Sequence, residues 1–160
     1  MSRLIYIAIL IFMFQACQSD VVYTKYQTID NQAWSQKNSL LYDIPIKDSL
    51  DQYNLFINIR NNNEYAYSNI LLITKMTFPD KTKVVDTLEY EMTDNEGQFL
   101  GSGFSDIKEN KLFYKQNVRF KNTGTYLFEI RQAMRKRNNV KGIDPLQGIK
   151  DVGISVEKVK

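Results

Sequence analysis

Apolar and polar side chains alternate along several segments of this chain, and a period of two is the pattern of a β-strand with one face on a core. In residues 53–60, Tyr53, Leu55, Ile57 and Ile59 alternate with Asn54, Asn58 and Arg60, and Phe56 interrupts the pattern. Residues 84–93, 112–120, 125–131 and 152–156 predict further strands, separated by turn residues. The chain beyond residue 20 is also rich in Tyr, Phe, Ile, Val and Thr, which favour strands. The sequence therefore predicts an all-β fold.

Four other segments complete the predicted sheets. Residues 67–78 are almost continuously apolar, which predicts a central strand covered on both faces. Residues 22–29 and 40–46 are expected to pair at the start of the sheet system, and Pro45 favours an edge position for the second. Residues 97–104 combine aromatic residues with glycines, which predicts a bulged or bent strand.

Seven or eight short strands predict an antiparallel β-sandwich of the jelly-roll or immunoglobulin-like kind, with a closed barrel as the alternative. The only stretch without a strand pattern is residues 132–150, where we expect one short helix, near residues 133–137, or an irregular segment. A chain of 160 residues is long enough for one domain and short for two. We therefore predict a single sandwich domain over residues 25–160.

The first residues have the layout of a signal peptide. Arg3 precedes an apolar run over residues 4–14, which is too short for the roughly 20 residues that a membrane-spanning helix needs. Ala16 is a small residue directly before Cys17, as at the sites where lipoprotein signal peptidase cuts. An ordinary secretory peptide would need a small residue at Phe14 as well. We predict a bacterial lipoprotein precursor with a signal peptide at 1–16, a lipidated N-terminus and tether at 17–24, and Cys17 as the anchoring residue.

The amino-acid composition excludes several classes of function. The chain has no histidine, and Cys17 is its only cysteine, so Ser-His-Asp and Cys-His catalysis, His-ligated metals and a disulfide framework are excluded. Carboxylate-pair chemistry and a Lys or Tyr base remain open. The formal net charge of +3 is too small for a nucleic-acid footprint. The composition therefore weakens the hypothesis of an enzyme without excluding it, and we expect no cofactor and no nucleic-acid partner.

Two groups of residues are candidate partner contacts. Arg60 with Tyr65 and Tyr67 combines a cation with aromatic rings near a strand end, as contact surfaces often do. Arg131 and Arg135 begin a basic run that could dock on lipid phosphates or on a negatively charged partner. Turn packing and a solvated loop are the structural alternatives. Trp34 is expected to close the core edge, with ligand binding as its alternative.

An acidic group could hold Ca²⁺, since this ion prefers several oxygen ligands. It comprises Asp86, Glu89, Glu91, Asp94 and Glu96. However, the spacing of a calcium-binding loop is missing, so we expect no metal site.

The chain resembles the GldH family of gliding-motility lipoproteins from Bacteroidota. The resemblance rests on the lipoprotein start, Tyr26 with Trp34, residues 53–61 and 65–70, Asp86-Thr87-Leu88-Glu89, Gly97-x-x-x-Gly101-x-Gly103, Tyr126-x-Phe128-x-Ile130-Arg131-Gln132-Ala133-Met134-Arg135, Gly142-Ile143 and Asp151-Val152-Gly153-Ile154. Phe99 stands where a tryptophan is expected, and residues 138–147 match loosely. The resemblance implies a non-enzymatic lipoprotein that supports the gliding machinery, which is linked to type IX secretion. It carries over only Cys17 as a site.

Our leading hypothesis is a lipid-anchored sandwich that binds other gliding or secretion proteins of the envelope. The alternative is a lipid-anchored carbohydrate-binding module or carbohydrate-acting enzyme, and a third idea is a stability factor for a neighbouring lipoprotein. We expect no other small-molecule ligand. Residues 18–22 offer a single acid, Asp20, whereas surface-exported lipoproteins often carry several, so we predict the periplasmic leaflet of the outer membrane.

Overall fold

The computed structural model describes residues 20–159, and it confirms the predicted antiparallel β-sandwich. The only helical element in these residues is a short 3₁₀ turn at Asp30–Gln32. None of the helical structure in this part of the chain is long and apolar enough to cross a membrane. The predicted signal peptide and Cys17 lie outside the described residues.

The strands pair in a nested order, as if the chain were one long hairpin folded back on itself. The innermost pair is β5 (Asn69–Thr77) with β6 (Lys83–Glu91). Outside it follow β4 (Tyr53–Asn61) with β7 (Lys108–Val118), β3 (Leu40–Ile46) with β8 (Gly124–Gln132), β2 (Ala33–Trp34) with β9 (Leu146–Gln147), and β1 (Val21–Thr28) with β10 (Ile149–Lys158). Each strand of the first half therefore finds its partner at the mirror position in the second half.

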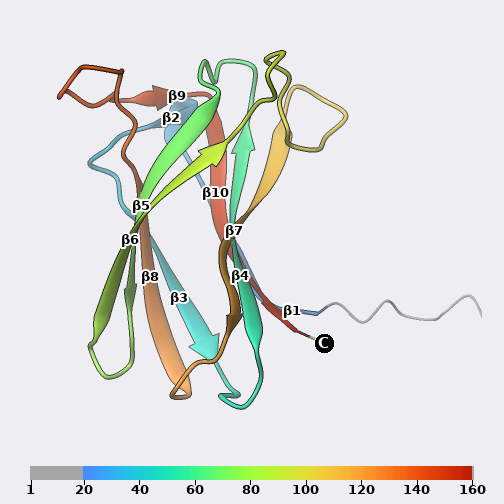
Figure 1. The fold of residues 1–160 in the computed structure, drawn as a ribbon, viewed down its shortest axis with the longest axis vertical. Helices are drawn as coiled ribbons and strands as arrows, with labels where there is room; N and C mark the ends of the chain where they lie inside the picture. The colour runs from blue at the N-terminus through green and yellow to red at the C-terminus, as the bar shows by residue number, and fades with distance from the viewer. Residues whose placement is uncertain (1–19, 160) are drawn as a thin grey trace, which may run out of the picture.

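Two additional pairings divide this hairpin between two sheets. β10 also pairs with β4, which gives a first sheet in the order β1-β10-β4-β7. β8 also pairs with β5, which gives a second sheet in the order β3-β8-β5-β6. Figure 1 shows the second sheet on the left and the first on the right. Eight main strands in this order form a jelly roll, which is one of the two kinds of sandwich that the sequence predicted. The two sheets are separate, so the fold is a sandwich rather than the closed barrel weighed as the alternative.

The core lies between the sheets and consists of the inward side chains of alternate strand positions. Its largest fully buried side chains include Trp34, Tyr42, Tyr126 and Phe128. Burial of one large apolar side chain contributes about 1.5–3 kcal/mol. Trp34 donates its indole N–H to the carbonyl of Asn38 at 2.9 Å, so its one donor is already used within the fold.

Two predictions about individual strands are wrong. β5 is central, between β8 and β6, but only its inward face is buried, while Leu71 and Ile73 point outward and are half-buried. β1 and β3 do not pair, because they lie in different sheets. β3 is an edge strand, as Pro45 predicted.

The long connections also differ from the expectations in part. Residues 97–104 form no strand and are held by isolated bridges from Thr93 to Phe99 and from Ser102 to Glu109. Residues 133–148 contain no helix and, apart from β9, are irregular, so the second of the two predicted possibilities is the observed one. β1 begins at Val21, inside the range predicted as a tether.

The two ends of the sandwich differ in their loops (Figure 1). At the tether end, the chain enters at Asp20, whose carbonyl accepts the N–H of Lys158 at 2.8 Å, and the loops 47–52, 78–82 and 119–123 are short. The distal end carries residues 29–39, 62–68, 92–107 and 133–148. The longest connections are therefore gathered at the end opposite the chain's entrance.

Gly148 is a position where the fold requires glycine. The φ angle of Gly148 is +81°, and Gly97, with a φ of +82°, is a matched position for comparison. A Cβ at Gly148 would overlap the backbone nitrogen of Tyr65, whereas a Cβ at Gly97 would meet nothing within 4 Å. We expect Gly148→Ala to lower the free energy of unfolding by about 3 kcal/mol or more, and Gly97→Ala by about 1 kcal/mol. Urea unfolding followed by Trp34 fluorescence measures both. Equal losses would contradict the overlap.

Candidate functional site

A polar cluster on the outer face of the first sheet is centred on Arg60. This Arg60 cluster comprises Tyr26, Thr28, Arg60, Glu109 and Asp151. Nε and Nη2 of Arg60 both lie 3.3 Å from Oε2 of Glu109, and Nη1 lies 3.8 Å from Oδ2 of Asp151. The guanidinium carbon lies 4.3 Å from the ring centroid of Tyr26, in a cation–π contact. Because these residues come from β1, β4, β7 and β10, the cluster connects all four strands of the sheet.

The charges of the Arg60 cluster are satisfied within the sheet. Tyr26 donates its hydroxyl to Oε1 of Glu109 at 2.6 Å, and Thr28 donates to Oδ1 of Asp151 at 2.7 Å. The hydrogen bond from Tyr26, and then Arg60, hold the pKa of Glu109 below its usual value. Burial, followed by the bond to Glu109, raises the pKa of Tyr26 to about 12. Arg60, although its side chain is 36% exposed, therefore acts as a clamp across the sheet.

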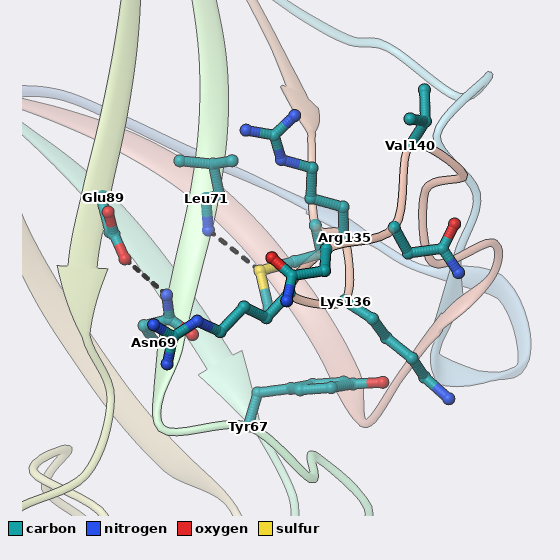
Figure 2. A pocket seen from close by; sticks show the side chains of 11 residues that line it. Tyr67, Asn69, Leu71, Glu89, Arg135, Lys136 and Val140 are labelled. Carbon is teal, nitrogen blue, oxygen red and sulfur yellow. Dashed lines mark hydrogen bonds between the residues drawn. The ribbon is translucent and has the colours of Figure 1, made fainter.

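A large concave surface lies at the distal end, and we call it the distal groove. Its main part has a volume of about 1020 Å³ and is lined by Tyr67, Asn69, Leu71, Glu89 and residues 134–140. A second part of about 780 Å³ adjoins it, because Asn69, Glu89 and Arg137 line both. Figure 2 shows the main part between the strands that carry Leu71 and Glu89 and the loop that carries Arg135, Lys136 and Val140.

The buried amide of Gln132 fixes the loop that forms one wall of the groove. Its Nε2 donates to the carbonyls of Trp34 at 3.2 Å and Ile143 at 2.8 Å. Its Oε1 accepts the N–H of Met134 at 2.8 Å. One side chain thus joins both ends of the 134–143 loop to β2.

Met134 attaches the same loop to β5. Its sulfur accepts the N–H of Leu71 at 3.2 Å, and its carbonyl accepts the N–H of Ile143 at 2.8 Å and the side-chain amide of Gln36 at 2.9 Å. Gly142 has no Cβ, and a Cβ there would overlap the amide of Gln36. Gly142 therefore makes room for this hydrogen bond at the base of the loop.

Tyr65 and Tyr67 lie just before β5 and have different roles at the groove. Tyr65 is buried and donates its hydroxyl to the carbonyl of Asn69 at 2.6 Å, and burial raises its pKa. Tyr67 packs against it edge to face, with ring centroids 5.8 Å apart. Tyr65 therefore supports Tyr67, which lines the groove.

The charges around the groove are divided between its walls. Arg135, Lys136 and Arg137 come from the loop, whereas Glu89, Glu91 and Asp94 come from β6 and the turn after it. Glu89 accepts the side-chain amide of Asn69 at 2.5 Å. None of the six ion pairs within residues 20–159 involves these six residues.

The predicted contact residues do not form one site. Tyr67 and Arg135 meet at the distal groove, with Tyr65 directly behind Tyr67. Arg131 lines a separate, smaller depression of about 320 Å³ on the outer face of the second sheet. Arg60 belongs to the cluster on the other sheet.

Sequence reasoning missed the residues that shape the groove. Gln132 continues the inward positions of β8, so a polar residue in the alternation was the available signal. Met134 and Leu71 gave no signal of their own, because apolar residues near strands usually belong to a core.

Two of the acidic residues weighed as a calcium site, Asp86 and Asp94, make other contacts. Asp86 pairs with Lys115 at 3.0 Å and accepts the hydroxyl of Tyr114 at 2.9 Å. Asp94 accepts backbone N–H groups of its own turn, from Glu96 and Gln98. In the part of the chain that the structure describes, no three acidic side chains gather as metal ligands would.

Comparison with known proteins places the chain in a family. A family model described as GldH lipoprotein matches residues 21–156. The chain belongs to the GldH lipoprotein family. It is 47% identical over 148 residues to the "Gliding motility lipoprotein GldH homolog" of Christiangramia forsetii, which covers 92% of this chain and 90% of the relative. It is 41% identical over 151 residues to the "Gliding motility lipoprotein GldH" of Flavobacterium johnsoniae, which covers 94% and 91%.

Membership of the GldH family makes this chain a lipoprotein of the cell envelope with a role in gliding motility. Similarity to solved structures is low. The VP2 subviral particle of infectious bursal disease virus matches with a TM-score of 0.40 and 13% identity over 86% of this chain. The virus of the Gx strain matches with 0.38 and 11% over 86%. The chain spans 32% and 30% of those two chains, about a third of their length.

The hydroxyl of Tyr26 should stabilise the first sheet in a pH-dependent way. We expect Tyr26→Phe to lower the free energy of unfolding by about 1 kcal/mol at neutral pH. Since the pKa of Glu109 is lower in the folded chain than in the unfolded one, its ionised form stabilises the fold above the unfolded pKa. The stabilisation by ionised Glu109 is lost as the pH falls through its folded pKa. The loss of unfolding free energy caused by Tyr26→Phe should therefore be smaller in acid.

Urea unfolding at neutral and acidic pH measures this difference. Tyr23→Phe is a matched control on the same strand, because the buried Tyr23 hydroxyl has no hydrogen-bond partner among the described residues. We expect Tyr23→Phe to leave stability unchanged or to raise it. A Tyr26→Phe loss that is the same at both pH values would argue against the role of Glu109.

Replacement of Gln132 should release the groove loop. Gln132→Leu keeps a similar volume but removes the three hydrogen bonds that the Gln132 amide makes to backbone groups, so we expect the free energy of unfolding to fall by about 2–4 kcal/mol. Hydrogen exchange of residues 134–143 should become faster than in the native protein. Gln147→Leu is the control, because Gln147 is exposed and its side chain makes no hydrogen bond in the described structure. Unchanged exchange in the Gln132 variant would show that other contacts hold the loop.

Proposed function

We propose that this protein, anchored through lipid on Cys17, serves gliding by binding another envelope protein at its distal end, without catalysis. The observation that carries this proposal is the arrangement of the loops. The longest connections and the distal groove lie together at the end opposite the chain's entrance. Binding residues are disproportionately found on loops that a rigid scaffold positions.

The proposed anchor would present this end to partners. Only three residues, 18–20, separate Cys17 from β1, and an extended residue spans at most roughly 3.6 Å. The tether end is therefore held close to the membrane surface. The distal groove faces away from it, where a partner can reach it.

A binding role also fits the side chains of the groove. A nucleophilic mechanism needs a nucleophile within hydrogen-bond reach of a base, and the chain has no histidine and only Cys17 as a thiol. The groove is lined instead by an aromatic ring, apolar side chains and charges from two walls. Side chains of these types are common at protein–protein contact surfaces.

The proposal places the protein on the periplasmic leaflet of the outer membrane. A single acid, Asp20, follows Cys17 closely, which supports retention there rather than surface export. The family resemblance motivates a link to type IX secretion. Protease treatment of intact cells would digest a surface-exposed protein and would spare a periplasmic one.

Charge reversal in the groove should impair gliding without loss of the protein. We expect Lys136→Glu with Arg137→Glu to remove most colony spreading in a deletion strain that spreads when the native gene is restored. The matched control is Lys25→Glu with Lys150→Glu, because both lysines are exposed, lie outside the groove lining and make no ion pair among the described residues. Immunoblots check equal abundance. Normal spreading of the groove variant at normal abundance would refute the proposal.

A second candidate function is glycan binding, and one feature of the groove favours it. The ring of Tyr67 lines the groove beside the amides of Asn69, Asn138 and Asn139, and aromatic rings with amides suit sugar faces and hydroxyls. A glycan array probed with the full-length protein in detergent decides between the two. Binding that Tyr67→Ala removes and Tyr90→Phe preserves would favour this candidate.

A further inference from the structure

The distal groove is electrically dipolar, because its opposite charges face each other without pairing. Its loop wall carries Arg135, Lys136 and Arg137, and its β6 wall carries acidic residues. Elsewhere in residues 20–159 some opposite charges on neighbouring strands do pair, as Arg60 on β4 does with Glu109 on β7 at 3.3 Å. The separation at the groove is therefore a property of that site rather than of the whole surface.

Rigid attachments keep the two walls apart. The loop is fixed at its base by Gln132 and Met134, and β6 is paired with β5 over its full length. Because these contacts fix the backbone of both walls, little backbone ordering is needed when a ligand arrives. A ligand of complementary charge thus meets a preorganised surface.

The floor and the ends of the groove are apolar. Tyr67, Leu71 and Met134 lie between the charged walls. Val140, which is 98% exposed, lines the main part, and Leu100, which is 57% exposed, lines the adjoining part. Exposed apolar side chains at a concave surface are typical of protein contact sites.

The divided charge restricts the occupant. A uniformly anionic ligand, such as a nucleic acid or a phospholipid surface, would be repelled by Glu91 and Asp94. The groove also crosses β5, β6 and the loop, which spans roughly 10 Å or more at a strand spacing of about 4.8 Å. Three or more residues of an extended chain cover such a distance at about 3.3 Å each.

We propose that the distal groove binds an extended segment of a partner protein that carries acidic side chains at one end, a basic side chain at the other and apolar residues between. The acidic end contacts Arg135, Lys136 and Arg137, whose guanidinium groups suit bidentate carboxylate contacts. The basic end contacts Glu91 and Asp94. This inference rests on the proposed function and adds the chemistry and direction of the partner segment.

Zero-length cross-linking of the full-length protein in its own membranes tests this direction. A carbodiimide joins an amine to a carboxylate only when the two are in contact. We expect mass spectrometry to find Lys136 linked to an Asp or Glu of a partner protein, and Glu91 or Asp94 linked to a Lys of the same short segment. Lys136→Arg keeps the charge but removes the amine, and should abolish the first link.

A photo-reactive residue at position 140 separates this inference from the proposed function, because its capture of a neighbour does not depend on charge. We expect it to capture the same partner. Lys136→Glu with Arg137→Glu should lower that capture about tenfold, and Lys25→Glu with Lys150→Glu should not. A rise in ionic strength from about 0.1 M to 1 M should also lower capture, since it shortens the Debye length from about 10 Å to 3 Å.

The possible outcomes are distinct. Capture of a protein from position 140 that charge reversal leaves unchanged, with no link at Lys136, would overturn the dipolar segment and leave the proposed function intact. Capture of no protein from position 140 would overturn both. Capture of a polysaccharide there would overturn both in favour of the glycan-binding candidate.

Discussion

The hydrogen bonding of β10 between β1 and β4 is the interaction on which the rest of the structure depends. β10 is the last strand in the chain, and its inward residues Val152, Ile154 and Val156 are fully buried. Because its partners lie in the first half of the chain, the first sheet cannot be complete until the C-terminal strand is in place. Gly148 and Gly153 allow the close approaches that this position requires, to Tyr65 and Tyr26 respectively. Both the core and the positions of the distal loops therefore depend on the pairing of this C-terminal strand.

The sequence predicted the strands better than their partners. The alternation in residues 53–60 and 152–156 reports local burial of one face, which a single strand shows by itself. Pairing is non-local, so nothing in residues 22–29 or 40–46 indicated that β1 and β3 would lie in different sheets. The continuous apolar run in β5 suggested two covered faces, but its outward side chains are half-buried on the sheet surface instead. Periodicity therefore identifies elements, and the nested order emerges only from the whole chain.

The candidate site was predictable by residue type and not by position. Tyr67 and Arg135 were recognised as an aromatic ring and a cation, and they line the same groove although a long stretch of sequence separates them. Arg60 had the same signature, yet the structure surrounds it with Tyr26, Glu109 and Asp151. A cation and a neighbouring ring look alike in sequence whether the cation clamps a sheet or faces a partner. Only the presence or absence of anionic neighbours separates these two roles.

That distinction bears on why the fold tolerates the arrangement at the distal end. Exposed ion pairs contribute only about 0–1 kcal/mol each, so leaving Lys136 and Arg137 unpaired costs the fold little. On the first sheet, by contrast, the side chain of Asp151 is only 10% exposed, and its contacts with Arg60 and Thr28 satisfy a carboxylate that would otherwise be costly to bury. Charge at the sheet is therefore constrained by stability, whereas charge at the groove is free to be set by binding. In a protein tethered at its other end, these unpaired charges lie where a partner can bind them.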